Sequence, residues 1–390
     1  MKKVRGFLFS GVHAGLKRKR KDVGLIYSLN ESLSFAVFTK NKFKGAHIPV
    51  SKEHLKSGTS RAIIVNSANA NTLNGEKGIR DAIRMTEITA NLLGLKKDDV
   101  LVASTGLIGV PLPMKKIEKG IKLAAMSLTK NGISDFEEAI MTTDKVKKEA
   151  STYFRYKGNE IRILGMAKGS GMIEPNMATM LAFIVTDAKI ELNALKRTLR
   201  FCVGKTFNRI SVDGCMSTND SVFIMANGRS GIPRIDRGKS FYMFRDALLE
   251  ICRDLSFQIV KDGEGATKVI RIIVRNADSE SFGKDVARRV ANSNLVKTAI
   301  YGEDPNFGRI IAAIGTLSDR VREDIDVSVG EEVVIKDGRI IKFDRKKTKE
   351  KLKKDTVEIV IDLKDGNKEV EFLTSDLTED YVVINSRYTT

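Results

Sequence analysis

The chain has 390 residues, of which 42% are hydrophobic and 30% charged, and its formal net charge at pH 7 is +18. This length is enough for two or three domains around a large buried core, and the composition is that of an ordinary soluble protein. No apolar run approaches the roughly 18 residues of a membrane span. The first residues lack the cleavage signature of a signal peptide, so we expect neither feature.

The cysteines and histidines indicate a reducing compartment and no metal site. The three cysteines are widely spaced, and none belongs to a Cys-x-x-Cys pair. The three histidines all lie near the N-terminus, without the spacing of metal ligands. We therefore expect a cytoplasmic protein without disulfides or bound metal ions.

The positive charge raises the question of a nucleic-acid partner. The lysines are spread along the chain and alternate with glutamate, as in Glu350-Lys-Leu-Lys-Lys-Asp355, and no tryptophan is present to stack on bases. This pattern favours a solvated, ion-paired surface, and the positive field would attract small anionic ligands. We predict no nucleic-acid and no membrane partner. A non-enzymatic basic binding protein is the alternative.

In chain order, the first elements are predicted strands. Two are expected over 24–29 and 34–39, joined by a turn at Asn30-Glu31-Ser32. A third, over 61–66, runs into the small and amide residues Ser67-Ala-Asn-Ala-Asn71. Such a segment either lines a site or caps the helix that follows it.

Two later segments of this half contain hydroxyl residues in turns. Asp99-Val-Leu-Val-Ala-Ser-Thr-Gly-Leu-Ile-Gly109 is a strand that ends in a glycine turn. Backbone amides of such a turn can face developing negative charge, and a turn needed only to reverse the chain is the alternative. After a predicted helix over 113–128 comes Ala139-Ile-Met-Thr-Thr-Asp144. Its threonines either contact a ligand or cap a turn.

The most distinctive stretch is Lys168-Gly-Ser-Gly-Met-Ile-Glu-Pro-Asn-Met-Ala-Thr-Met-Leu181. Apolar runs enter and leave it, and its glycines, proline and asparagine indicate a forced turn. A threonine hydroxyl is a weak nucleophile, but the α-amine of a chain-terminal threonine can act as its base. The stretch therefore suggests a self-cleaving nucleophile, in which the Thr179 hydroxyl attacks the Ala178 carbonyl. An ordinary hairpin is the alternative.

The second half is predicted to alternate helices with polar segments. Helices are expected over 192–207, 240–260 and 279–295. Cys202 lies on the first helix and is expected in the core. In Lys261-Asp-Gly-Glu-Gly-Ala-Thr-Lys268, a carboxylate between two glycines, Glu264, can approach a ligand ammonium closely. A solvated turn carboxylate is the alternative.

Together, these motifs resemble those of the ornithine acetyltransferase (glutamate N-acetyltransferase) family of arginine biosynthesis, whose members cleave themselves before the threonine of an Ala-Thr-Met-Leu motif. The resemblance extends from Gly6 to Thr390 and includes Asp304-Pro-Asn-Phe-Gly-Arg-Ile310. The chain departs from the family pattern at four positions: Lys145, Cys215, Met216 and Phe307. Because two of them lie in the 211–222 loop, we assign that loop no catalytic role.

The resemblance implies an α/β (α+β) fold, a layered helix/sheet/sheet/helix sandwich of the self-cleaving N-terminal-nucleophile type, with a smaller C-terminal α+β domain. We assign 1–280 to the catalytic domain. The C-terminal domain, 281–390, has a tail that is expected to return to the active site. Cleavage between Ala178 and Thr179 would leave an α chain (1–178) and a β chain that associate, and we expect an α2β2 assembly.

The resemblance also assigns roles to individual residues. Thr179 would be the nucleophile, and Thr105 and Gly106 would hold the oxyanion. The residues expected to bind substrate are Thr142, Lys168, Thr179, Glu264, Asn385 and Thr390. Lys168 and Glu264 have opposite charges and suit an amino-acid substrate, but the sequence does not assign either of them to one end of it.

The implied reaction is that of a glutamate N-acetyltransferase. Acetyl would pass from N2-acetylornithine to Thr179 and then to glutamate, in ping-pong order and without a cofactor. The sequence leaves open whether acetyl-CoA also serves as a donor. A self-cleaving amidase or aminopeptidase of related fold, with water as the acceptor, is the alternative among enzymes.

Overall fold

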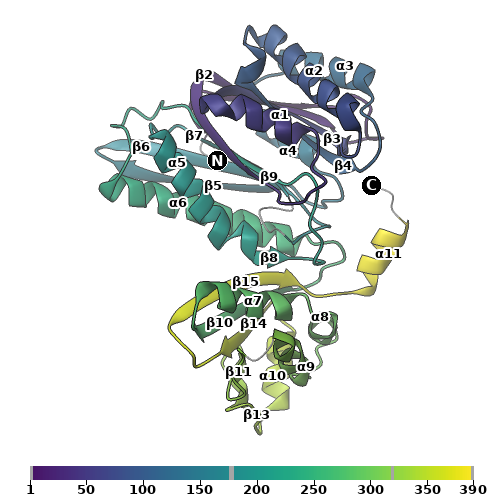
Figure 1. Ribbon diagram of the computed structural model, residues 1–390, viewed down its shortest axis with the longest axis vertical. Coiled ribbons are helices and arrows are strands. Elements are labelled where there is room, and N and C mark those ends of the chain that lie inside the picture. The colour runs from purple at the N-terminus through teal and green to yellow at the C-terminus, as the bar shows by residue number, and fades with distance from the viewer. Residues whose placement is uncertain (1–2, 175–179, 318–319, 388–390) are drawn as a thin grey trace.

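The computed structural model describes residues 3–174, 180–317 and 320–387. Ala178, Thr179 and Thr390 lie outside the described residues. The protein has two parts, each built around its own β-sheet, with the larger part above the smaller one in Figure 1. None of the helices within the described ranges is both long and apolar enough to traverse a lipid bilayer.

The sheet of the larger part has the strand order β4-β3-β2-β9-β7-β6-β5, with β1 paired to β2. Its strands are β1 (Phe7–Val12), β2 (Val23–Phe38), β3 (Thr59–Asn69), β4 (Val100–Leu107), β5 (Lys148–Tyr156), β6 (Asn159–Lys168), β7 (Leu181–Thr186) and β9 (Ser221–Ala226). Its helices are α1 (His47–His54), α2 (Gly75–Leu93), α3 (Met114–Met126), α4 (Ile133–Ile140), α5 (Leu192–Lys205) and α6 (Gly238–Lys261).

β2 is one long strand that bends the sheet. Its first part pairs with β1 and β3, whereas residues 33–38 pair with β9, and the register shifts between Tyr27 and Ser32. The expectation of two strands joined by a turn at 30–32 is therefore wrong. Asn30 and Glu31 are exposed and Ser32 is buried where the strand changes partners, and the chain does not reverse.

Side chains that alternate along the strands sort the larger part into layers. Ile63 on β3 and Phe183 on β7 belong to one buried cluster between the two halves of the bent sheet. Their chain neighbours face outward. Ile64 is buried with side chains of α2 and α3, and Ile184 with side chains of α5 and α6. This arrangement confirms the predicted helix/sheet/sheet/helix sandwich.

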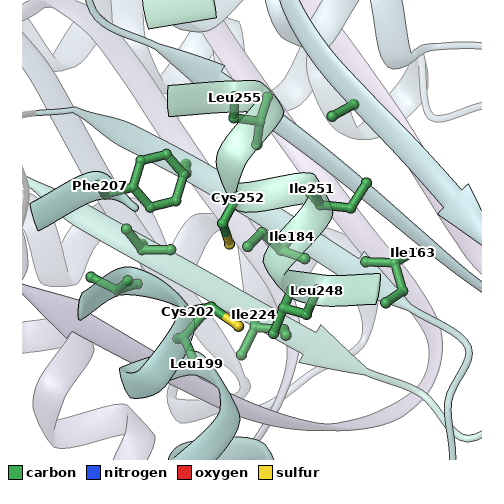
Figure 2. Close-up of a cluster of buried hydrophobic side chains, with 14 of the residues drawn as sticks. Ile163, Ile184, Leu199, Cys202, Phe207, Ile224, Leu248, Ile251, Cys252 and Leu255 are labelled. Atoms are coloured by element: carbon green, nitrogen blue, oxygen red, sulfur yellow. The ribbon is translucent and has the colours of Figure 1, made fainter. Parts of the chain in front are cut away.

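Figure 2 shows the layer that α5 and α6 form with β7 and β9. Cys202 on α5 and Cys252 on α6 both lie in this cluster, near Ile184 and Ile224, and neither cysteine is exposed to solvent. The prediction that Cys202 is a core residue is confirmed. This packed layer supports β7, the strand that begins two residues after Thr179.

The sheet of the smaller part has the order β13-β12-β11-β14-β10-β15-β8. Its strands are β8 (Ile210–Ser211), β10 (Val269–Ala277), β11 (Asp326–Val329), β12 (Glu332–Lys336), β13 (Arg339–Ile340), β14 (Thr356–Asp362) and β15 (Lys368–Ser375). The remaining helices are α7 (Glu280–Ala291), α8 (Asn294–Tyr301), α9 (Gly308–Ile314), α10 (Arg345–Leu352) and α11 (Glu379–Arg387).

The chain enters the smaller part earlier than the sequence suggested. The second sheet includes β8, which pairs with β15, and β10, which pairs with β14 and β15. Both strands lie inside the range 1–280 that we assigned to the catalytic domain. The helix expected over 279–295 is also two helices, because the Ser293 hydroxyl accepts a hydrogen bond from the Val296 amide and starts α8 there.

α11 carries the chain back from the smaller part toward the larger one (Figure 1). Just before it, Thr378 Oγ1 donates a hydrogen bond to the carbonyl of Gly265, at 2.7 Å. Gly265 has a φ of +72°, and a Cβ there would lie 2.4 Å from the backbone nitrogen of Tyr381. Only glycine lets the tail pack this closely against the 263–265 loop.

Candidate active site

A cleft brings together residues that are far apart in the sequence. Six predicted site residues line it: Thr105, Gly106, Thr142, Lys168, Glu264 and Asn385. Met180 and Leu181, which directly follow the predicted cleavage site, line it as well. The other lining residues are Thr143, Gly171, Met172, Ser217, Asn219 and Asp220. Every predicted site residue that the structure describes therefore lies at this one cleft.

Lys168 places a nearly buried cation in the cleft. It is the last residue of β6, and its exposed fraction is 8%. Burial lowers the pKa of Lys168, and the nearby charges of Asp144, Glu264 and Asp220 oppose this effect. Among the described residues, its ammonium has no hydrogen bond and no ion pair. A buried cation without a close partner is costly, so an anionic ligand group is favoured here.

The Glu264 carboxylate faces the cleft from a loop that is held on both sides. The Glu264 amide donates to the carbonyl of Ser170 at 3.0 Å, and Ser170 Oγ donates to the carbonyl of Asp262 at 2.6 Å. Asn385 Nδ2, on α11, donates to Glu264 Oε2 at 2.9 Å. A Cβ on Gly171 would lie 2.2 Å from the same oxygen, so a side chain at that position would displace the carboxylate.

Three buried charges hold the segments that carry these residues. Lys148 Nζ lies 2.7 Å from Asp144 Oδ1 and 2.5 Å from Asp262 Oδ2, and none of the three side chains is more than 4% exposed. Asp144 also accepts hydrogen bonds from the amides of Thr142, at 2.8 Å, and Gly169, at 2.7 Å. Burial alone would raise the pKa of Asp144. The positive charges of Lys148 and Lys168 instead hold this pKa well below its usual range.

The end of β4 has a strained backbone. Gly106 has a φ of +124°, and a Cβ there would lie 2.2 Å from the carbonyl carbon of Ala68 on β3. Ala68 itself has a φ of +96°, and the β3–β4 register shifts at this point. The adjacent Thr105 hydroxyl has no hydrogen-bond partner within the described parts of the chain. Thr105 and Gly106 are still paired with β3, so the glycine turn predicted from the sequence does not lie at these two residues. A strained strand end with an available donor suits the stabilisation of developing negative charge.

The sequence analysis missed Asn219, which supports this end of β4. Its Nδ2 donates to the carbonyls of Ala70, at 2.5 Å, and Ser104, at 2.8 Å, and its Oδ1 accepts from Thr72 Oγ1 at 2.8 Å. Asn219 therefore holds the end of β4 against the segment that follows β3. The Ser-Thr-Asn-Asp run at 217–220 was a usable signal, but the departures at 215 and 216 led us to assign the loop no role.

None of the four departures from the family pattern lines the cleft. Three of them make backbone hydrogen bonds that other residues can supply: the Lys145 amide donates one, and the Cys215 and Met216 carbonyls each accept one. The Cys215 thiol also donates to the carbonyl of Asp213, at 3.6 Å. Phe307 is buried in the core of the smaller part, where it packs edge-to-face against Phe343 with ring centroids 5.6 Å apart. The departures therefore leave the cleft-lining residues unchanged.

The chain is similar to known proteins over nearly its whole length. The profile of the ArgJ family matches residues 8–390. The chain is 46% identical, over 99% of its length and 97% of the relative's, to the arginine biosynthesis bifunctional protein ArgJ of Caldanaerobacter subterraneus subsp. tengcongensis. It is 44% identical to the protein of the same name from Bacillus subtilis, over 99% of this chain and 95% of that one.

Two solved structures are also similar to parts of the chain. One is an arginine biosynthesis bifunctional protein ArgJ from Bacillus halodurans, 41% identical over 45% of this chain and 92% of that one, with a TM-score of 0.43. The other is an ornithine acetyltransferase from Mycobacterium tuberculosis complexed with ornithine, 32% identical over 45% of this chain and 94% of that one, with a TM-score of 0.41. The family profile and the full-length relatives decide the assignment: the chain belongs to the ArgJ family, the acetyltransferase family of arginine biosynthesis that its motifs resemble.

Proposed function

We propose that the chain is a glutamate N-acetyltransferase, which moves an acetyl group from N2-acetylornithine to glutamate through an ester on Thr179. The observation that carries the proposal is the composition of the cleft. It combines a nearly buried cation, Lys168, with a carboxylate, Glu264, beside the strained end of β4 at Thr105 and Gly106. An amino acid that carries both a carboxylate and an ammonium group complements this pair of charges.

In this proposal, each end of the substrate has its own partner. Lys168 binds the substrate carboxylate, because the Lys168 ammonium has no ion pair of its own among the described residues. Glu264 binds the ammonium at the other end, and Asn385 holds the Glu264 carboxylate in position. Thr142, at the same cleft, completes the pocket with its hydroxyl.

Self-cleavage generates the nucleophile. The Thr179 hydroxyl attacks the Ala178 carbonyl, and the peptide bond becomes an ester. Water then hydrolyses the ester, which leaves a carboxylate on Ala178 and a free α-amine on Thr179. The support for this step is that Met180, the residue bonded to Thr179, lines the same cleft as Thr105 and Gly106.

The acetyl group then moves in two steps. In the first, the Thr179 oxygen attacks the acetyl carbon of N2-acetylornithine, and its own α-amine, with an ordinary pKa of about 7.7–8.0, takes the hydroxyl proton. Thr105 and Gly106 stabilise the oxyanion; one such donor is typically worth about 2.7–4 kcal/mol. The C–N bond breaks, the proton passes to the departing nitrogen, and ornithine leaves.

In the second step, the α-amine of glutamate attacks the acetyl ester. The Thr179 α-amine takes a proton from the attacking nitrogen and returns it to the Thr179 oxygen, so N-acetylglutamate leaves and the enzyme is restored. The two fragments stay together because β6 and β7, on either side of the cut, are hydrogen-bonded neighbours. We further propose an α2β2 assembly that acts in the cytoplasm.

The test combines a denaturing gel with an activity assay. Purified protein should run as two bands, whereas Thr179→Ala should remain one band and transfer no acetyl group. Mass spectrometry after incubation with N2-acetylornithine alone should find one acetyl group on residue 179. Acetyl-CoA plus glutamate, assayed separately, decides whether there is a second donor.

Two outcomes would overturn the proposal. A Thr179→Ala protein that is still cleaved would show that another group cuts the chain. Ornithine release that glutamate does not accelerate would indicate water as the acceptor, and hence the amidase alternative.

A further inference from the structure

We propose that Asp144, Lys148 and Asp262, defined here as the charge cluster, are positioning residues that set substrate affinity at the cleft and supply the negative charge beside Lys168. The inference rests on the proposed function in one respect, that Lys168 binds the substrate carboxylate. It goes beyond that function because none of the three residues lines the cleft.

The first side of the cluster reaches two cleft-lining segments through Asp144. One carboxylate oxygen accepts the Thr142 amide at 2.8 Å, and the other accepts the Gly169 amide at 2.7 Å. Gly169 directly follows Lys168 in the chain. The position of Asp144 thus fixes the backbone on both sides of the space that a ligand carboxylate would enter.

The second side reaches the Glu264 loop through Asp262. Its carboxylate accepts the Lys145 amide at 3.1 Å, and its backbone carbonyl accepts Ser170 Oγ at 2.6 Å. Glu264 lies two residues farther along the chain. Lys148 forms ion pairs with both carboxylates. The segments that carry Lys168 and Glu264, the proposed partners of the substrate charges, are therefore connected through Lys148.

The charge of the cluster also matters. Two carboxylates and one ammonium leave a net charge of −1 in a region that solvent hardly reaches. Burying such a charge costs stability unless an opposite charge lies close by. Lys168 is the nearly buried cation beside the cluster, and Asp144 is the charge that most favours its protonated form. The excess negative charge therefore acts on the residue that is proposed to hold the substrate carboxylate.

Several other charged groups near Lys168 also affect its protonation. Glu264 and Asp220 favour its charged form, whereas burial and Lys148 oppose it. Lys17 is a further nearby cation; burial lowers the pKa of Lys17 to about 8, and its Nζ donates to the carbonyl of Met141 at 2.5 Å. Lys148 and Lys17 are both cations near Lys168 and disfavour a further positive charge. If the Asp144 charge is removed, Lys168 should therefore lose its proton at a lower pH.

The experiment measures ornithine binding by titration calorimetry from pH 6 to pH 10, together with the KM for N2-acetylornithine. In Asp144→Asn we expect at least about ten-fold weaker binding at pH 8–9. The pH at which binding is lost should fall by about one unit, the size of effect typical of a close opposite charge. Asp144 acts directly on Lys168, whereas Asp262 acts through Lys148 and Asp144, so Asp262→Asn should shift the same midpoint less.

A rescue variant separates charge from simple loss of structure. Arginine keeps its charge at every pH of the titration, so Asp144→Asn combined with Lys168→Arg should bind ornithine without the early loss at high pH. The matched control is Asp187→Asn. Asp187 is also buried, pairs with Arg5 and accepts a backbone amide, but it follows the far end of β7. This control should not move the midpoint.

The outcomes are distinct. The inference would be overturned if ornithine binding were lost at the wild-type pH in both Asp144→Asn and Asp262→Asn. The cluster would then have a purely structural role. If Asp144→Asn does not fold, an unshifted Asp262→Asn alone overturns it. Wild-type protein that binds no ornithine at any pH would instead overturn the proposed function, and this inference with it.

Discussion

The carboxylate of Glu264 lies directly against the α-carbon of Gly171, with room for a hydrogen atom but not for a methyl group. A Cβ on Gly171 would sit 2.2 Å from Oε2 and 2.5 Å from Oε1 of that carboxylate. The two residues belong to different segments of the cleft, and this contact sets how far Glu264 can extend into it.

Gly171→Ala should therefore impair binding rather than folding. The added methyl group pushes the Glu264 carboxylate away from its position beside Asn385, so we expect the KM for N2-acetylornithine to rise at least about ten-fold while stability changes by less than about 1 kcal/mol. Gly204→Ala is the control, because a Cβ there meets nothing within 4 Å. It should stabilise α5 by about 0.5–1 kcal/mol and leave KM unchanged. An unchanged KM in Gly171→Ala would contradict the role of this contact.

Gly106→Ala should distort the end of β4 and remove most of the activity. Its methyl group would lie 2.2 Å from a backbone carbon of Ala68, at a φ of +124° that L-residues rarely adopt. We expect at least a hundred-fold loss of kcat, as for loss of an oxyanion donor. Gly109→Ala has a φ of +80° but open space around the new Cβ, so it should cost only about 1–2 kcal/mol of stability. Equal kcat values in the two variants would exclude a catalytic role for the end of β4.

His47 predicts a loss of stability in acid. Burial lowers the pKa of His47 to about 4, while the unfolded chain has an ordinary histidine pKa of about 6.5. The unfolded state therefore binds the extra proton first. The contribution of neutral His47 is complete above pH 6.5 and is lost as the pH falls toward 4, by about 3 kcal/mol in total.

His47→Gln tests this pH dependence. Glutamine can still donate to the Asn219 carbonyl, which His47 Nε2 approaches at 3.2 Å. We expect the difference in unfolding free energy between wild type and variant, measured with urea, to change by about 2–3 kcal/mol in favour of the variant from pH 7 to pH 4.5. Parallel curves for the two proteins would show that His47 does not titrate in this range.

The buried Glu137 carboxyl should make the folded protein less stable as the pH rises from 4.5 to 8. Burial, and then the charge of Glu149, raise the pKa of Glu137 to about 8. Between pH 4.5 and pH 8 the folded protein keeps this proton while the unfolded chain loses it, so stability falls as the pH rises. Glu137→Gln imitates the protonated acid and should show its largest gain in Tm over wild type at pH 8. The exposed Glu76→Gln should show no such gain.

Several features of the cleft could be predicted because their cause is local. A glycine with a positive φ, as at Gly106, or a carboxylate between two glycines, as at Glu264, leaves a visible pattern in the sequence. The layered fold follows in the same way from alternating apolar residues such as Ile63 and Ile64, which face opposite sides of one strand.

Other features could not be predicted because they depend on contacts between distant segments. Asn30 and Glu31 have the composition of a turn, but an exposed bend in a continuous strand accepts the same residues. The apolar pattern of β10 indicates a strand without indicating which sheet it joins. Lys148 and Asp262 look like surface charges in a chain rich in lysine and glutamate, and only the fold shows that they are paired and buried.

The strand order has one further consequence for a chain cut after residue 178. β9 and β7 are neighbours in the sheet, and β2 and β6, from the other fragment, flank them. Neither fragment can therefore leave without exposing two rows of unpaired backbone groups. Once heat or denaturant separates the fragments, refolding becomes a bimolecular encounter, so recovery of the folded protein should depend on its concentration.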